Sequence, residues 1–355
     1  MATPRYTLPS SPAYTCTDRF SLHPDPFVTE DVNGQVPFWT ILQTLLSTPI
    51  TSVPSLIDLL ETISVTLTGT SNPAGDHGIL RRILSQPKHE TFFSKCWPSL
   101  ANLALQLSDL FPDGYIPILG RAPEFETRVR LSRKQTACLV IHQFLRTLRA
   151  PEWRNDGTHD FGIWYGSEQR QESAVLAYLE ALFTYFEMVV CVPGCLDGNH
   201  EWRVEYVLRS VDGEDYRAVV DEVKPLGEIE VVIVDEYDTL PASLGVPVGA
   251  AAVSANKYVG FGQSATQEEV HVGVSPEACP AVLITPPLED DQILVVSGPQ
   301  AMVNVIGQRR CIRVEEMPLP DGGEGVWKER MMLFMDALEL DLVAREAEGI
   351  YGIFL

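Results

Sequence analysis

From residue 36 to residue 188, apolar residues recur every three or four positions, which is the spacing of one buried helix face. Leu100, Leu103, Leu107 and Leu110 show this period clearly. Ser132 stands where a side chain would cap the start of another helix. After an irregular lead-in over residues 1–35, the pattern predicts helices over residues 36–46, 54–63, 79–84, 92–110, 131–148 and 171–188.

A different pattern begins at Val189, where short β-branched and apolar runs are separated by turn residues, as is typical of strands. It predicts strands over residues 189–192, 202–208, 229–234, 269–274, 281–284, 292–298, 311–314 and 331–338. A helical first half before a mixed second half indicates the α+β or α/β class. We therefore expect a helical region over residues 36–188 and a sheet-containing domain over residues 189–355.

Composition narrows the class of protein. The chain has 355 residues, enough for two domains or one large one, and 45% of them are hydrophobic. A formal net charge of −22 disfavours direct binding to nucleic acid or to an anionic membrane surface. The first residues carry no apolar signal core, and we find no run of about 18 apolar residues, so we expect no membrane span.

Seven cysteines, an odd number, lie mostly in apolar surroundings. This is typical of reduced, buried thiols in an intracellular protein, in the nucleus or the cytoplasm. Cys191 and Cys195 have a C-x3-C spacing, but no second Cys or His pair accompanies them, so we expect no metal. His142 lies inside a predicted helix and is interpreted as a packed or surface histidine rather than a ligand.

The strongest chemical signal is the stretch from Val259 to Val270, where Gly260 and Gly262 precede the adjacent carboxylates of Glu268 and Glu269. Glycines allow a backbone to approach a ligand closely. Adjacent carboxylates repel each other, so one can be tuned to act as an acid. The plain alternative is a solvated acidic turn, but the apolar runs on both sides favour a packed site.

Other common catalytic motifs are missing from the chain. No Ser-His-Asp order, Walker loop or H-E-x-x-H motif occurs. The two glycines also lack the expected strand–glycine–helix context of a dinucleotide-binding fingerprint.

The same stretch resembles the signature of the poly(ADP-ribose) glycohydrolase family, which reads Ala-Asn, Gly-Gly-Gly, a short spacer and Gln-Glu-Glu. The corresponding residues here are Ala255-Asn256, Gly260-Phe-Gly and Gln267-Glu-Glu. The resemblance extends to Phe92-Phe93, Ile116-Pro-Ile-Leu, Ser275-Pro-Glu and Ile293-Leu-Val-Val-Ser-Gly, and spans roughly residues 91–355.

This resemblance implies a macrodomain-like mixed β-sheet flanked by helices, preceded by a helical accessory region. It implies hydrolysis of ribose–ribose bonds in poly(ADP-ribose), with that polymer or ADP-ribosylated proteins as partners and no cofactor. Glu269 would be the general acid, and Glu268 would hold a ribose hydroxyl. The implied substrate-binding residues are Asn256, Gly260, Phe261, Gly262 and Gln267.

The sequence departs from the family pattern within the signature. Phe261 replaces the middle glycine, and Val253 replaces an aspartate before Ala-Asn. Only four residues separate Gly262 from Gln267, a shorter spacer than the family has. We expect the bulk of Phe261 to lie where the loop backbone should meet the diphosphate.

Further departures lie downstream. Gln308 stands where the family has an adenine-stacking tyrosine, so Tyr258 or Phe354 would have to substitute. The family's second glycine-rich loop is not found before Leu355, so we expect a C-terminally incomplete domain. Two alternatives therefore stay open: a catalytically impaired module that binds ADP-ribose or a protein partner, and an unrelated acidic scaffold.

Overall fold

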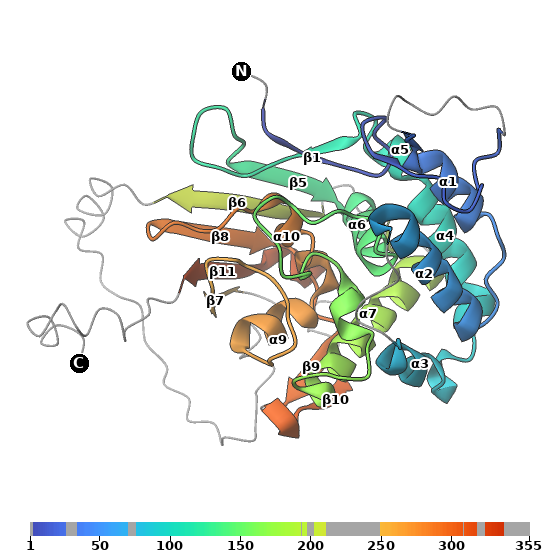
Figure 1. Ribbon diagram of the computed structural model, residues 1–355. Coiled ribbons are helices and arrows are strands. Elements are labelled where there is room, and N and C mark those ends of the chain that lie inside the picture. The colour runs from blue at the N-terminus through green and yellow to red at the C-terminus, as the bar shows by residue number, and fades with distance from the viewer. Residues whose placement is uncertain are drawn as a thin grey trace, which may run out of the picture.

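The computed structural model describes residues 3–25, 34–69, 76–192, 194–196, 202–210, 249–307, 309–317 and 324–336. A group of helices lies beside a five-stranded sheet, and helices α6 and α7 lie between the two (Figure 1). Helices precede most of the sheet in the chain, so the predicted α+β class is confirmed.

The helices of the first part follow the predicted segments closely. They are α1 (Phe38–Leu46), α2 (Val53–Thr68), α3 (Gly78–Leu84), α4 (Trp97–Leu105), α5 (Leu107–Leu110), α6 (Arg133–Phe144) and α7 (Glu172–Cys191). A π-helical turn, Phe92–Cys96, leads into α4.

Local side chains determine where two of these helices begin and end. Ser52 and Ser132 each accept a hydrogen bond from the backbone N–H three residues later, which starts α2 and α6. The helix predicted to run to Leu148 ends at Phe144, because Arg146 has a left-handed backbone with φ of 59°.

Helix α7 is, among the described residues, the one helix long and apolar enough to pass a test for a membrane span. Its most apolar window has a mean hydropathy of 1.6, which by length and composition alone would suffice to cross a membrane. However, 61% of that window is buried inside the protein, and α7 packs against α3, α4 and α9. Burial on several sides is typical of the core helix of a globular fold.

The five-stranded sheet has the order β5-β6-β8-β11-β7. These strands are β5 (Arg128–Ser132), β6 (Arg203–Ser210), β8 (Gln292–Ser297), β11 (Arg330–Asp336) and β7 (Gly249–Ala255). Neighbours pair antiparallel except β11 and β7, which are parallel, so the sheet is mixed. The predicted strands at 202–208 and 292–298 are confirmed, and the one at 331–338 is confirmed as far as residue 336, beyond which the chain lies outside the described residues.

Strand β5 lies within the region expected to be helical, so that region is not wholly helical. Helix α6 follows β5 directly and packs on both β5 and β6. The helical region and the sheet therefore share elements, and the division of the chain at residue 188 stays a prediction.

Three smaller antiparallel pairs complete the described strands. They join β1 (Arg5–Thr7) to β4 (Tyr115–Pro117), β2 (Thr15–Cys16) to β3 (Val36–Pro37), and β9 (Val303–Ile306) to β10 (Arg313–Glu316). The predicted irregular lead-in is thus ordered over residues 3–25, where Tyr6 and Tyr14 are buried. The strand predicted at 311–314 is shifted to β10.

Three predicted strands are wrong. Residues 189–191 continue α7, residues 269–273 belong to α9 (Gln267–Gly273), and residues 281–284 form α10. Short apolar runs fit a buried helix as well as a strand, and tertiary packing decides between them. The strand predicted at 229–234 lies outside the described residues.

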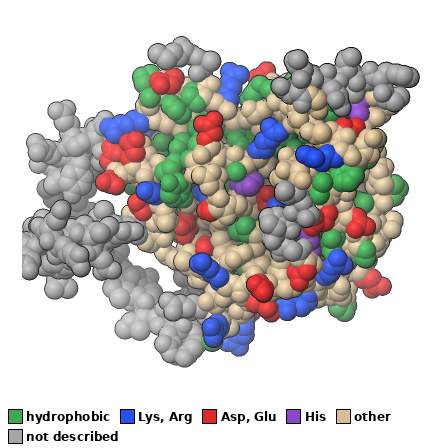
Figure 2. Space-filling model, viewed as in Figure 1, with side chains coloured by type: hydrophobic (Ala, Val, Ile, Leu, Met, Phe, Trp, Pro, Cys, Tyr) green, Lys and Arg blue, Asp and Glu red, His purple; other side chains and the backbone are tan. Residues whose placement is uncertain are grey.

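The cysteines and His142 fit the sequence interpretation. Cys16, Cys96, Cys138 and Cys279 are buried free thiols. His142 is also buried, with its ring nitrogens on Thr147 Oγ1 and the Ala104 carbonyl oxygen, so it is a packed histidine. Acidic and basic side chains are interspersed on the face in Figure 2.

Candidate functional site

The stretch Val259–Val270 connects edge strand β7 to helix α9. The glycines therefore do lie between a strand and a helix, which corrects the expectation that this context is missing. Thr266 begins α9 by accepting a hydrogen bond from the Glu269 N–H, and the Glu269 carboxylate accepts one from the Thr266 N–H. This reciprocal cap explains why the valines of residues 270–274 form a helix and not a strand.

Glu268 is the buried member of the carboxylate pair, with 8% of its surface exposed. Its oxygens accept the Gly260 N–H at 2.7 Å and the Asn256 N–H at 3.2 Å. Burial raises the pKa of Glu268 to about 7, although these two N–H groups and the Arg154 guanidinium oppose that rise. The site thus holds a carboxyl group that exchanges its proton near neutral pH.

Glu269 is half-buried and faces the other part of the loop. Its carboxylate accepts the Ser264 N–H at 2.6 Å in addition to the Thr266 N–H at 3.2 Å. The two neighbouring carboxylates therefore hold opposite ends of the loop: Glu268 holds Gly260, and Glu269 holds Ser264.

Both glycines are needed for steric reasons that the structure shows directly. A Cβ atom at Gly262 would collide with the Glu269 carboxylate. A Cβ atom at Gly260 would lie 2.9 Å from Val282 Cγ1, which is closer than real Cβ atoms come, and 3.1 Å from Arg154 Nη2, which is tighter than most real Cβ contacts. Neither position accepts a larger residue without displacing the groups around the carboxylate pair.

The Phe261 side chain points into the protein, with 3% of its surface exposed. Its ring lies 5.2 Å from the rings of both Phe161 and Trp164, which belong to the 3₁₀ helix Phe161–Trp164. The Phe261 side chain was expected to obstruct the outer surface of the loop. Instead it is buried beneath the loop and anchors it. Trp164 adds a second anchor, because its indole N–H donates to the Gly262 carbonyl oxygen at 2.8 Å.

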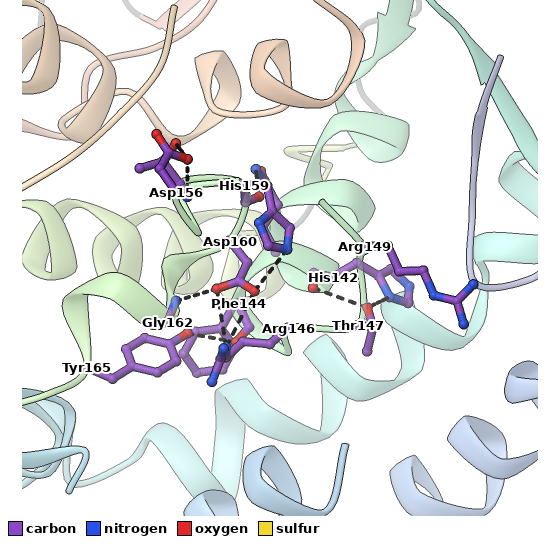
Figure 3. A network of polar contacts seen from close by, with 12 residues as sticks. His142, Phe144, Arg146, Thr147, Arg149, Asp156, His159, Asp160, Gly162 and Tyr165 are labelled. Carbon is purple, nitrogen blue, oxygen red and sulfur yellow. Dashed lines mark hydrogen bonds and ion pairs between the residues drawn. The ribbon is translucent and has the colours of Figure 1, made fainter. Parts of the chain in front are cut away.

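The anchoring segment, residues 151–165, is itself held by a polar network (Figure 3). Asp160 accepts the Gly162 N–H at 2.7 Å and the Arg146 Nε at 3.2 Å. The Tyr165 hydroxyl donates to the Phe144 carbonyl oxygen at 2.7 Å. These contacts fix the segment on the end of α6, so the helical part of the chain positions the loop of the candidate site.

The remaining predicted residues line the outer side of the site. Asn256 is exposed, and its side-chain oxygen accepts the Tyr258 N–H at 3.2 Å. Gln267 is exposed and bonds to the Ser254 N–H and the Ala252 carbonyl oxygen of β7. The Tyr258 ring is 41% exposed beside them, whereas Gln308 and Phe354 lie outside the described residues.

Sequence reasoning missed three residues of this site. Arg154 lies against Gly260, Trp164 holds Gly262, and Tyr178 of α7 packs on Gly273 of α9. The Tyr178 hydroxyl is buried without a hydrogen-bond partner, and burial followed by the nearby charge of Glu269 raises its pKa. Trp164 is 1% exposed beneath the glycine loop, and nothing in the sequence showed which loop it holds.

The site consists of two neighbouring carboxylates and the backbone N–H groups of the loop that they hold. Among the described residues, no group of three or more His, Cys, Asp or Glu side chains could hold a metal ion. The geometry defines a class: a mixed-sheet α+β protein with a carboxylate pair on a strand–glycine loop–helix unit.

Family comparison defines the protein more closely. The model of the poly(ADP-ribose) glycohydrolase helical domain matches residues 84–205, and the model of the same family's macro domain fold matches residues 246–348. The chain therefore belongs to the poly(ADP-ribose) glycohydrolase family, with a helical region followed by a macro-fold domain. No individual curated protein matches it significantly.

Proposed function

We propose that this chain hydrolyses the ribose–ribose glycosidic bonds of poly(ADP-ribose) and releases ADP-ribose. The observation that carries the proposal is the carboxylate pair of Glu268 and Glu269, held against the glycine loop at the end of β7 within the macro-fold match. Glycosidic cleavage through an oxocarbenium-like transition state needs a proton donor and a nearby negative charge.

Glu269 is the proposed general acid. It is the more exposed carboxylate of the pair, so it can reach a substrate oxygen. Glu268 is 8% exposed, and backbone N–H groups already occupy both of its oxygens. We therefore assign proton donation to Glu269, and positioning of a ribose hydroxyl to Glu268.

The substrate would lie on the outer side of the loop. Asn256 would orient the ribose, and the backbone of residues 260–262 would approach the diphosphate, with the side chain of Phe261 turned inward. Gln267 would contact the substrate from the first turn of α9. Tyr258 is the proposed adenine platform because its ring is exposed beside Asn256.

The second candidate function is an ADP-ribose-binding module without turnover. One observation favours it: the Glu269 carboxylate is bound to the Ser264 and Thr266 N–H groups, an arrangement that caps a helix instead of presenting a proton. An intracellular location, in the nucleus or the cytoplasm, belongs to either proposal.

The experiment compares wild type with Glu269→Gln, following ADP-ribose release from purified poly(ADP-ribose). We expect the substitution to lower the rate by about 10²–10⁴-fold, the usual contribution of a positioned acid. Glu289→Gln, a matched change at a 63% exposed side chain, should leave the rate unchanged. Calorimetric binding of ADP-ribose without any release would replace the hydrolase with the binding module, and neither release nor binding would refute both.

A further inference from the structure

Arg154 is a buried arginine of the 151–165 segment that lies against the glycine loop. Only 3% of its surface is exposed. Its Nη2 donates to the Val259 carbonyl oxygen and its Nη1 donates to Thr158 Oγ1 at 2.6 Å, so both bonds go to neutral oxygens. Its buried Nε has no hydrogen-bond partner. A charge in this position is costly unless an anion lies nearby.

The nearby anions are Asp156, two residues further along the same segment, and Glu268, on α9. Burial lowers the pKa of Arg154, while Asp156, Glu268 and Tyr258 oppose that effect in this order. The negative charges of Glu268, in the candidate site, and of the exposed Asp156 thus both favour the charged form of the guanidinium.

Gly260 connects this cation to the carboxylate. A Cβ atom there would lie 3.1 Å and 3.2 Å from the two terminal guanidinium nitrogens of Arg154, and the Gly260 N–H donates to Glu268 at 2.7 Å. The guanidinium and the carboxylate therefore contact the same residue. The preceding carbonyl, of Val259, is held by the guanidinium as well.

We infer that Arg154 is a positioning residue of the proposed hydrolase: it fixes the loop backbone that holds Glu268, and its positive charge favours the ionised form of this carboxylate. This inference rests on the proposed function. The charged groups that face Glu268 are Arg154 from the 151–165 segment and Glu269 on its own helix; the other polar neighbours are the backbone N–H groups of Asn256 and Gly260.

The charge has a direct consequence for the chemistry. An ionised Glu268 accepts the Gly260 and Asn256 N–H groups and can also accept a ribose hydroxyl, whereas a protonated one loses acceptor capacity. Arg154 lowers the pKa of Glu268 against the dominant effect of burial. Without the guanidinium, the carboxylate would be protonated over more of the neutral pH range, and the low-pH limb of activity would move upward.

The test measures the titration of Glu268 in the free protein by carboxyl ¹³C NMR, with the signal assigned from its loss in Glu268→Gln. In Arg154→Met we expect the Glu268 titration midpoint to rise by about one pH unit or more, since a nearby opposite charge has effects of this size. The pH at which ADP-ribose release falls off on the acidic side should rise by a similar amount. Arg130→Met removes an exposed arginine of β5 and should change neither measurement.

A midpoint that does not move in Arg154→Met would overturn the inference. Arg154→Lys gives a second decision that does not depend on the folding of the Met variant. Lysine keeps the positive charge but lacks the planar guanidinium that donates to two oxygens at once. The titration midpoint of Glu268 should therefore stay near that of wild type, while kcat/KM falls about tenfold or more. A folded Lys variant with unchanged kcat/KM would also overturn it. A wild type without hydrolysis refutes the proposed function alone, because the titration needs no substrate.

Discussion

Two buried glutamates of this protein have opposite surroundings. Glu277 is fully buried and forms an ion pair with Arg133 Nε at 2.9 Å, while its second oxygen accepts the Gln300 N–H at 3.1 Å. Glu268 is almost as buried, but within the described part of the chain its hydrogen bonds come only from backbone N–H groups. Glu277 is in direct contact with the Arg133 guanidinium. Glu268 is separated from the Arg154 guanidinium by Gly260.

The difference has electrostatic consequences. Burial is the largest single influence on the pKa of Arg133 and lowers it, but Glu277, Tyr185 and Cys195 together outweigh burial, so the net shift is upward. The pKa of Glu268 is raised to about 7 because backbone dipoles and a more distant cation do not offset its burial. The carboxylate of Glu277 thus has an arginine in direct contact, whereas the carboxyl group of Glu268 at the candidate site has a pKa close to neutral pH.

The largest expected effect comes from breaking the ion pair. Glu277→Gln leaves the Arg133 guanidinium buried without its anion and should lower the free energy of unfolding by about 3–5 kcal/mol. Denaturant titration measures this loss. Glu205→Gln removes a partner of the exposed Arg130 and should cost about 0–1 kcal/mol. Equal losses in the two variants would show that Glu277 carries no special structural role.

A smaller effect concerns the pH dependence of stability. The folded-state pKa of Glu268 lies above its ordinary value of 4.5, so the folded protein holds this proton more tightly than the unfolded chain does. The resulting stability is complete below about pH 4.5 and is lost as the pH rises through about 7. At about 1.4 kcal/mol per pKa unit, the loss amounts to about 3 kcal/mol.

Glu268→Gln cannot titrate, so its stability should fall less than that of wild type between about pH 4.5 and pH 8. Chemical denaturation of both proteins across this range measures the difference. Parallel curves for the two proteins would mean that Glu268 ionises normally, and the contrast with Glu277 would disappear.

The smallest expected effect tests strain in the loop. Ala265 has a left-handed backbone with φ of 56°, which is unfavourable for a residue with a Cβ atom. Ala265→Gly should raise the free energy of unfolding by up to about 1 kcal/mol. The matched change Ala281→Gly, in α10 with ordinary helical geometry, should lower it. Thermal unfolding of the two variants distinguishes release of strain from a general effect of glycine.

Much of the helical part followed from local pattern. The leucine spacing of residues 100–110 and the serine at position 132 led to helices that the structure contains, because periodic burial and caps act over a few residues. Residues 269–274 were assigned wrongly, because the Thr266 cap outweighs the strand preference of alternating valines.

The candidate site also contains some residues that local sequence indicates and others that only the fold brings together. The signature placed Asn256, the two glycines and the carboxylates on one loop, since they are neighbours in sequence. The roles of Arg154, Trp164 and Tyr178 could not be predicted, because these residues lie about 90 to 110 positions away along the chain and reach the loop only after folding.

The sequence alone determined the family, the α+β class and the identity of the carboxylate pair, because these depend on residue types in a fixed order. Only the tertiary structure decided that Phe261 turns inward, that Glu268 is buried while Glu269 caps α9, and that a guanidinium from the helical region lies against Gly260. Burial and distance between segments set the charge state of a carboxyl group, and both exist only in the folded chain.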